Sequence, residues 1–155
     1  MVKKIPKVPV VLQLEIVECG AASLAMVMAY HKKWVPLERL RVDCGVSRDG
    51  STAKGIVKVA RLYGFEAQGY RVEPSHIGDI PLPCVIHWNM NHFVVLKSIT
   101  KKYAYINDPA KGEVKVPIEQ FNTSFTGIAI AITPGEDFEP GGKPEIGRAS
   151  CRERV

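Results

Sequence analysis

Gln13-Leu-Glu-Ile-Val-Glu-Cys19-Gly-Ala-Ala-Ser23 is the stretch that decides the fold, because it sets a cysteine at the start of a predicted helix. The apolar residues after the cysteine recur with the spacing of one helix face: Ala22, Leu24, Ala25, Val27, Met28 and Ala29. This pattern predicts an amphipathic helix over residues 19–32. The small residues directly after Cys19 would let the helix pack closely beside another element.

A helix start suits a reactive cysteine. The first turn of a helix presents unpaired N–H groups and roughly half a positive charge. That field favours the thiolate of Cys19 over the thiol, and the thiolate is the nucleophilic form. An ordinary buried cysteine would produce the same local pattern, because free cysteines are often buried. The segments around His92 and Asp108 favour the reactive interpretation.

His92 begins a run, Phe93-Val-Val-Leu-Lys-Ser-Ile-Thr100, that predicts a mostly buried strand. The next predicted strand, 103–107, ends at Asp108-Pro109. A hairpin of these two strands would return Asp108 to hydrogen-bonding distance of His92. The alternatives are a satisfied core histidine and ordinary turn chemistry, since aspartate before proline often starts a turn.

Four ordered motifs together resemble the bacteriocin-processing cysteine peptidases, papain-like domains found at the N-terminus of peptidase-containing ABC transporters. The motifs are residues 13–23, Pro83-Cys-Val-Ile-His-Trp88, His92-Phe-Val-Val-Leu96 and Asn107-Asp-Pro-Ala-Lys-Gly112. The resemblance covers about residues 8–134. Residues 18–26 and 44–51 most resemble the branch that handles lanthipeptide and related precursors.

The resemblance implies a cysteine endopeptidase that removes a leader peptide after a double-glycine-type site, Gly-Gly or Gly-Ala, on the cytosolic side of the membrane. It implies that Cys19 is the nucleophile, His92 the base, Asp108 the residue that orients the base, and Gln13 the oxyanion donor. The implied partners are the precursor leader peptide and the transmembrane and ATP-binding domains of a transporter. Glu18, where many relatives carry aspartate, is a mild departure.

Two other functions remain open. One is a degenerate domain that holds leader peptides for export without cutting them, although such domains typically lack the nucleophile that Cys19 supplies. The other is a papain-like acyl-transfer enzyme, such as a transglutaminase or an amidase, with the same three residue types in a different cleft.

Composition agrees with a soluble single domain. Of the 155 residues, 46% are hydrophobic and 24% are charged, and no apolar run has membrane-spanning length. The net charge is +5, yet no basic run exceeds two residues, so nucleic acid is not an expected partner. No cofactor or metal is expected. A zinc site from Cys44, Cys84, His87 and His92 would lack any recognised spacing, and the cysteines are interpreted as reduced thiols.

The order of elements predicts an α+β fold in which an N-terminal helical layer packs on a C-terminal antiparallel sheet. The predicted helices cover residues 19–32, 36–44 and 51–63. The predicted strands cover 65–72, 84–87, 93–100, 103–107, 113–116 and 128–133, with short helical turns at 75–80 and 118–122. The thiol would then lie on the helical layer and the imidazole on the sheet, with a cleft between them.

A substrate channel and a groove for a leader helix would need walls of aromatic and apolar residues. The candidates for these walls are Trp88, Met90, Tyr63, Tyr70 and Phe65. Each of them has an alternative place in the hydrophobic core.

The peptidase domain is predicted to span residues 1–134 and to be followed by a linker at 135–144, which is rich in glycine, proline and acidic residues. Residues 145–155 carry both charge signs and no periodicity. They resemble a translated sequencing adapter and are interpreted as a non-native tail.

Removing residues 145–155 is therefore expected to leave the protein unchanged, because little buried surface would be lost. Melting temperature and the rate of cleavage of a double-glycine precursor should be compared for the full chain and a chain ending at Lys143. Exposed ion pairs of the tail would contribute only about 0–1 kcal/mol. A drop of several degrees or of an order of magnitude in rate would show that the tail is a working part of the protein.

Overall fold

The computed structural model describes residues 6–12, 19–43, 52–89, 92–136 and 138–142. Three helices come first: α1 (Cys19–Tyr30), α2 (Leu37–Asp43) and α3 (Ala53–Leu62). Six strands follow: β1 (Phe65–Arg71), β2 (Cys84–Trp88), β3 (His92–Ile99), β4 (Tyr103–Asp108), β5 (Gly112–Pro117) and β6 (Phe125–Pro134). A short 3₁₀ helix, η2 (Pro74–Asp79), precedes β2, and helix α4 (Ile118–Ser124) precedes β6.

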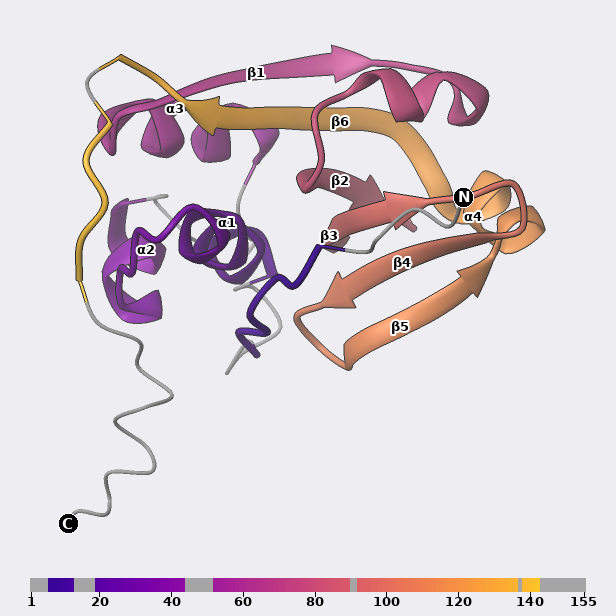
Figure 1. Ribbon diagram of the computed structural model, residues 1–155, viewed down its shortest axis with the longest axis horizontal. Coiled ribbons are helices and arrows are strands. Elements are labelled where there is room, and N and C mark those ends of the chain that lie inside the picture. Colours follow the sequence, from indigo (N-terminus) through magenta and orange to yellow (C-terminus); the bar gives the residue numbers. More distant parts are fainter. Residues whose placement is uncertain (1–5, 13–18, 44–51, 90–91, 137, 143–155) are drawn as a thin grey trace, which may run out of the picture.

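The strands form one antiparallel sheet in the order β1-β6-β2-β3-β4-β5. Figure 1 shows α1, α2 and α3 gathered at one end of the molecule and α4 at the other. The predicted α+β arrangement, with a helical layer on an antiparallel sheet, is confirmed. The central strands β2 and β3 are buried along most of their length, as their continuous apolar sequences predict.

Helix α1 is not amphipathic, and in this respect the prediction was wrong. Every residue from Cys19 to Ala29 is buried. The reason is tertiary: α1 packs on β3 and β2 of the sheet and is also contacted by α2 and α3, while Val8 of the N-terminal segment belongs to the same core cluster. A helix that is apolar on every face is typical of a completely enclosed position. The small residues after Cys19 permit this enclosure because they allow neighbouring elements to approach closely.

The ends of the helices follow local signals. The Thr52 hydroxyl accepts a hydrogen bond from the N–H of Gly55 at 3.0 Å and caps α3, as predicted. Gly64 follows the end of α3 with a φ of 93°. Helix α1 ends at Tyr30, two residues earlier than expected, because Lys32 adopts a φ of 70° and turns the chain. Within the described ranges, none of the helices has the length and apolar character needed to cross a membrane.

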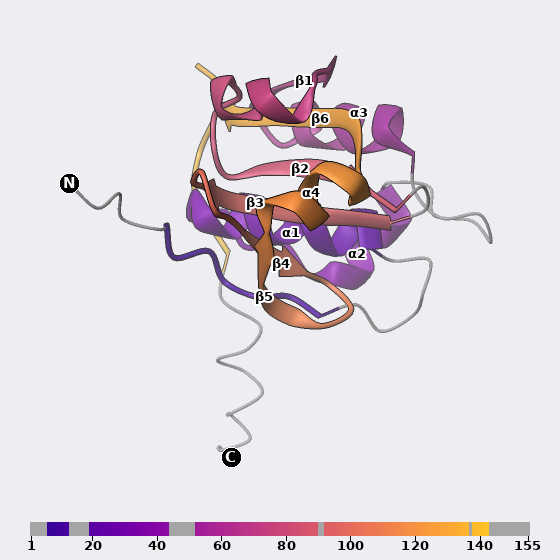
Figure 2. The ribbon, with the colours of Figure 1, turned by 90° about the vertical axis from the view of Figure 1, so that its right-hand side faces the viewer.

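The sheet separates two hydrophobic clusters. Residues such as Phe93, Val95 and Ile130 join the cluster that contains α1. Their neighbours Val94 and Leu96 join the other cluster, which η2 and α4 complete. This alternation follows from the two-residue period of a strand. In Figure 2, α4 lies at the end of the molecule that faces the viewer.

The segment after β6 lies against the folded domain, although its composition predicts a linker. The N–H of Trp34 donates to the carbonyl of Gly141 at 2.7 Å, and the N–H of Gly141 donates to the carbonyl of Lys32 at 3.0 Å. The ring of Phe138 packs on that of Phe65, with 4.7 Å between their centroids. Composition predicts no structure here, because these partners are distant in the sequence. We call the described residues 135–136 and 138–142 the strap.

Phe138→Ala is expected to lower the free energy of unfolding by roughly 1–3 kcal/mol, less than the ~3–5 kcal/mol lost when a fully buried phenylalanine is truncated. The loss should come from removing the aromatic contact that holds the strap to Phe65. Thermal or urea unfolding measures this change. The matched control is Leu62→Ala, since Leu62 is 72% exposed. Equal, negligible effects of the two variants would contradict a stabilising role for the strap.

Candidate active site

The site forms where the first residue of α1 meets the first residue of β3. Helix α1 packs directly on β3, so the N-terminus of the helix lies beside the start of the strand. The Cys19 thiol lies close enough to His92 to help raise the pKa of the imidazole. Cys19 is only 5% exposed, while 23% of the His92 side chain remains accessible. The thiol is therefore shielded, and solvent reaches the pair mainly through the imidazole.

Asp108 completes a chain of three side chains. The hairpin of β3 and β4 pairs Val95 with Asn107, which puts Asp108 diagonally across the ladder from His92. The Asp108 carboxylate oxygen Oδ1 lies 2.7 Å from Nε2 of His92. The same oxygen accepts a hydrogen bond from the N–H of Ala110 at 2.8 Å. The predicted return of Asp108 to His92 is confirmed, and the turn after β4 fixes the orientation of the carboxylate.

This geometry assigns the two ring nitrogens of His92 different partners. Nε2 is occupied by Asp108, so Nδ1 is the nitrogen available to Cys19. A carboxylate that holds one nitrogen in place fixes both the tautomer and the orientation of the ring. The other nitrogen can then take the proton of the thiol and return it later.

Electrostatics favour a protonated imidazole here. Burial lowers the pKa of His92, but the hydrogen bonds to Asp108 and Cys19, with the negative charges of both groups, raise it to about 9. Burial raises the pKa of Asp108, yet the hydrogen bonds from His92 and from the Ala110 N–H, with the positive charges of His92 and Lys111, leave it below its ordinary value. The environment therefore favours an imidazolium ion held by the Asp108 carboxylate.

Cys84 shows how different the setting of a structural cysteine is. It lies in β2, is completely buried in the second cluster, and has a pKa raised to about 12 by burial. Such a thiol stays protonated and unreactive at neutral pH. Within the described ranges, no three His, Cys, Asp or Glu side chains are grouped so that they could hold a metal ion.

Two buried hydrogen bonds near the site were not anticipated from the sequence. The Ser23 hydroxyl donates to the carbonyl of Phe93 at 3.1 Å, and the Asn107 side-chain amide donates to the carbonyl of Val8 at 2.9 Å. Each connects elements that are far apart in the sequence. The spacing of Ser23, four residues after Cys19, was the available signal, because residues at this spacing share one helix face.

Two of the predicted wall residues, Trp88 and Phe65, lie in different parts of the core. Trp88 is 7% exposed and packs in the second cluster, whereas Phe65 is 3% exposed and packs in the first, on the other side of the sheet. Both occupy the core, the alternative that the sequence left open. Tyr70 is exposed on β1. Met90 lies outside the described residues, as does Gln13.

The Tyr63 side chain lies among polar and charged groups. Its hydroxyl donates to the Asp43 carboxylate and so ties the end of α3 to the end of α2. Together with Phe65 it lines a groove of about 610 Å³. Apart from Leu62, the other groove residues are charged or glycine: Lys33, Arg61, Gly64, Glu66, Gly135, Glu136 and Glu139. This groove therefore differs from the apolar one that was expected to receive a leader helix.

Helices packed on an antiparallel sheet, with a Cys–His–Asp chain where they meet, are the arrangement of a papain-like cysteine peptidase. The sequence pattern of the Peptidase C39 family matches residues 7–137. The chain belongs to this family of cysteine peptidases.

Named relatives agree with this assignment. The probable microcin-H47 secretion/processing ATP-binding protein MchF of Escherichia coli is 36% identical over 132 residues, which are 85% of this chain and 19% of that protein. The chain thus spans about a fifth of the length of the curated relatives it matches.

Solved structures show the same fold. A double glycine motif protease from an AMS/PCAT transporter, crystallised in complex with the leader peptide, is 64% identical with a TM-score of 0.82. The match covers 84% of this chain and 94% of that one. The peptidase domain of Streptococcus ComA, a bi-functional ABC transporter involved in quorum sensing, is 26% identical with a TM-score of 0.77, over 83% of this chain and 99% of that one.

Asp108→Asn is expected to lower the pKa of His92 from about 9, because the substitution removes the negative charge that stabilises the imidazolium ion. NMR titration of the histidine ring protons measures this. His31 is the internal control: its pKa is lowered by burial between Tyr30 and Phe65, and it should not respond. An unchanged titration of His92 would contradict the electrostatic role of Asp108.

The pH dependence of stability follows with a definite sign. The raised pKa of His92 stabilises the fold fully below about 6.5, and this contribution is lost as pH rises through about 9. The lowered pKa of Asp108 stabilises the fold above about 3.8 and is lost as pH falls through its folded-state value. In Asp108→Asn, the loss of stability at acid pH should disappear with the carboxylate, and the loss at alkaline pH should become smaller. Melting temperature measured against pH checks both changes.

Proposed function

We propose that this domain is a cysteine endopeptidase that removes the leader peptide of a ribosomally made precursor after a double-glycine-type site, Gly-Gly or Gly-Ala. The observation that carries the proposal is the grouping of Cys19, His92 and Asp108, in which Asp108 holds Nε2 of His92 at 2.7 Å and Cys19 lies beside the same ring. Family membership supports the peptidase class. The complex of the 64% identical protease with its leader peptide supports the substrate class.

In the proposed reaction, the Cys19 sulfur attacks the carbonyl carbon of the second small residue of the site. His92 carries the proton of the thiol as an imidazolium ion, in keeping with its raised pKa, and a tetrahedral oxyanion forms. His92 then gives its proton to the leaving amine as the C–N bond breaks, which leaves a thioester on Cys19. A water molecule, deprotonated by His92, attacks the thioester and releases the leader with a new carboxylate, while the proton returns to the thiol.

Stabilisation of the oxyanion is the remaining requirement. The proposed donors are the side-chain amide of Gln13, by its place in the motif, and the unpaired N–H groups at the start of α1. Asp108 keeps the His92 ring in the orientation that each proton transfer needs. It stays ionised throughout, in keeping with its lowered pKa.

The wider setting is proposed from the relatives. MchF is a secretion/processing ATP-binding protein, so we propose that this domain works next to transmembrane and ATP-binding domains, on the cytosolic side of a bacterial membrane. The finer assignment to lanthipeptide precursors rests on the sequence of residues 18–26 and 44–51. The second of these ranges lies outside the described residues.

Cys19→Ala is expected to abolish cleavage while leaving the fold and leader binding intact. The loss should be on the order of 10⁶-fold, as for a triad nucleophile. Mass spectrometry of a double-glycine precursor incubated with the domain detects the products and the position of the cut. Cys84→Ala is the matched control, because it removes another buried thiol that lies outside the site.

The same measurement separates the rival functions. A wild-type domain that binds the precursor without cutting it would be a leader-holding module. A product in which the acyl group is joined to an amine as an amide, instead of ending in a free carboxylate, would indicate an acyl-transfer enzyme. Cleavage by Cys19→Ala at a rate close to wild type would refute the nucleophile assignment.

A further inference from the structure

The described contact between α1 and β3 includes a hydrogen bond from a completely buried side chain. The Ser23 hydroxyl, which is completely buried, donates to the backbone carbonyl of Phe93 at 3.1 Å. Ser23 lies one helical turn after Cys19, and Phe93 follows His92 directly in the chain. The bond therefore joins the two elements that carry the reacting pair, about 6 Å along the helix axis from Cys19.

The apolar contacts next to Ser23 are less suited to fix where helix α1 lies along strand β3. The residues of α1 between Cys19 and Ser23 are small: Gly20, Ala21 and Ala22. Apolar packing is non-directional, and short side chains form few interlocking contacts that would resist sliding of a helix along a strand. A hydrogen bond weakens steeply when its length or angle changes. Ser23 is thus the described contact best suited to fix the helix at one position along β3.

Position along β3 matters because the chemistry tolerates little error. A displacement of about 1 Å between reacting groups can cost on the order of 10²-fold in rate. The imidazole is already fixed from the other side, since Asp108 holds Nε2 of His92 at 2.7 Å. Displacement of α1 would therefore move the thiol relative to a stationary ring.

We propose that Ser23 is a positioning residue that holds the thiol of Cys19 against the imidazole of His92 by tying helix α1 to strand β3. This inference rests on the proposed function, in which Cys19 and His92 react as a pair. Ser23 itself acts only through the helix that it anchors.

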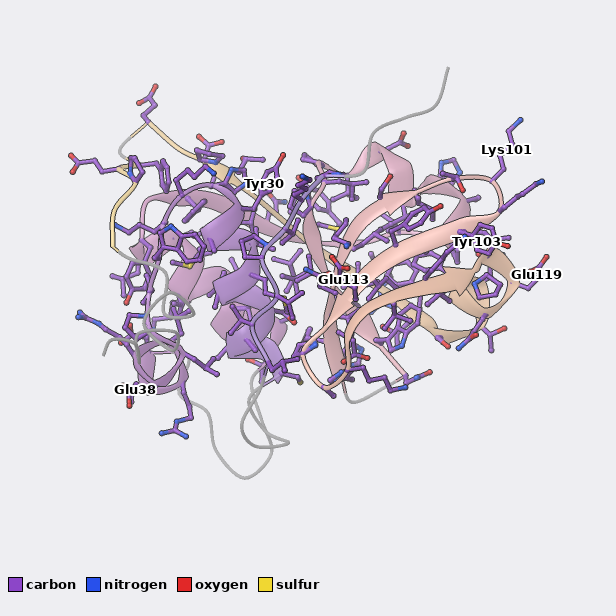
Figure 3. The ribbon with its side chains drawn as sticks, turned by 60° about the horizontal axis from the view of Figure 1, so that its bottom comes forward. Tyr30, Glu38, Lys101, Tyr103, Glu113 and Glu119 are labelled. Atoms are coloured by element: carbon purple, nitrogen blue, oxygen red, sulfur yellow. The ribbon has the colours of Figure 1, made fainter. Side chains whose placement is uncertain are left out.

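Ser98 provides a matched control in the same strand. It is 1% exposed, and its hydroxyl has no hydrogen-bond partner in the described structure. It lies toward the far end of β3 from His92, near the turn that Lys101 and Tyr103 mark in Figure 3. Ser98→Ala removes a buried hydroxyl from β3 without breaking a bond between elements.

The first readout is turnover of a double-glycine precursor. Ser23→Ala should lower kcat by roughly ten- to a hundredfold with KM nearly unchanged, because misplacement of the thiol affects the reaction more than binding. Ser98→Ala should keep the wild-type kcat. Ser23→Thr, which retains the hydroxyl, should recover part of the loss. Equal kcat values for wild type and Ser23→Ala, or equal losses in Ser23→Ala and Ser98→Ala, would overturn the proposal.

The second readout needs no substrate. The rate at which iodoacetamide alkylates Cys19, followed by mass spectrometry of the Cys19 peptide, reports the thiolate as a function of pH. In Ser23→Ala the midpoint of this profile should rise, because the imidazolium ion stabilises the thiolate less when the two separate. An unchanged midpoint would overturn the proposal.

The two readouts separate this inference from the proposed function. If wild type fails to cleave any double-glycine precursor while Ser23→Ala still shifts the alkylation profile, the positioning role stands and the proposed substrate is wrong. If wild type cleaves and Ser23→Ala changes neither readout, the proposed function stands and the positioning role is wrong. Circular dichroism and melting curves of both serine variants establish that the compared proteins are folded.

Discussion

The close packing of helix α1 against strand β3 is the contact on which the rest of the structure depends. It covers one side of the first helix, lies within the larger core cluster and brings Cys19 to His92. The cluster of small residues at the start of α1 makes the approach possible. A larger side chain at Ala21 or Ala22, both completely buried, would push the helix away from the sheet and separate Cys19 from His92.

The remaining elements hold this contact from outside. Strand β4 brings the Asp108 carboxylate to the far side of the His92 ring, and the turn at Ala110 fixes the carboxylate. At the other end of α1, the strap is bonded through Gly141 to Lys32 and Trp34. The helix that starts with the thiol is thus fixed near both of its ends. A shielded thiol with an accessible imidazole suits a reaction that must exclude competing water until the substrate covers the site.

The charges of the site also depend on this packing. Burial alone would lower the pKa of His92, and only the adjacent carboxylate and thiol reverse the direction. Cys84 shows what burial alone does to a thiol: it raises the pKa of the group, and the thiol stays inert. Two cysteines of one chain therefore differ in chemistry through their neighbours, although both are buried.

The sequence by itself determined the class of fold, the order of the elements and the three residues grouped at the candidate site. These are local properties: the spacing of apolar residues, the cap at Thr52, and a hairpin short enough to bring Asp108 back to His92. Tertiary structure alone decided what depends on distant partners. It buried every face of α1, placed Phe65 and Trp88 in opposite clusters, docked the strap on Phe65 and bonded Ser23 to Phe93. The physical reason is that exposure and hydrogen bonding depend on which segments meet in space, and these partners lie up to 73 positions apart in the sequence, as Phe65 and Phe138 do.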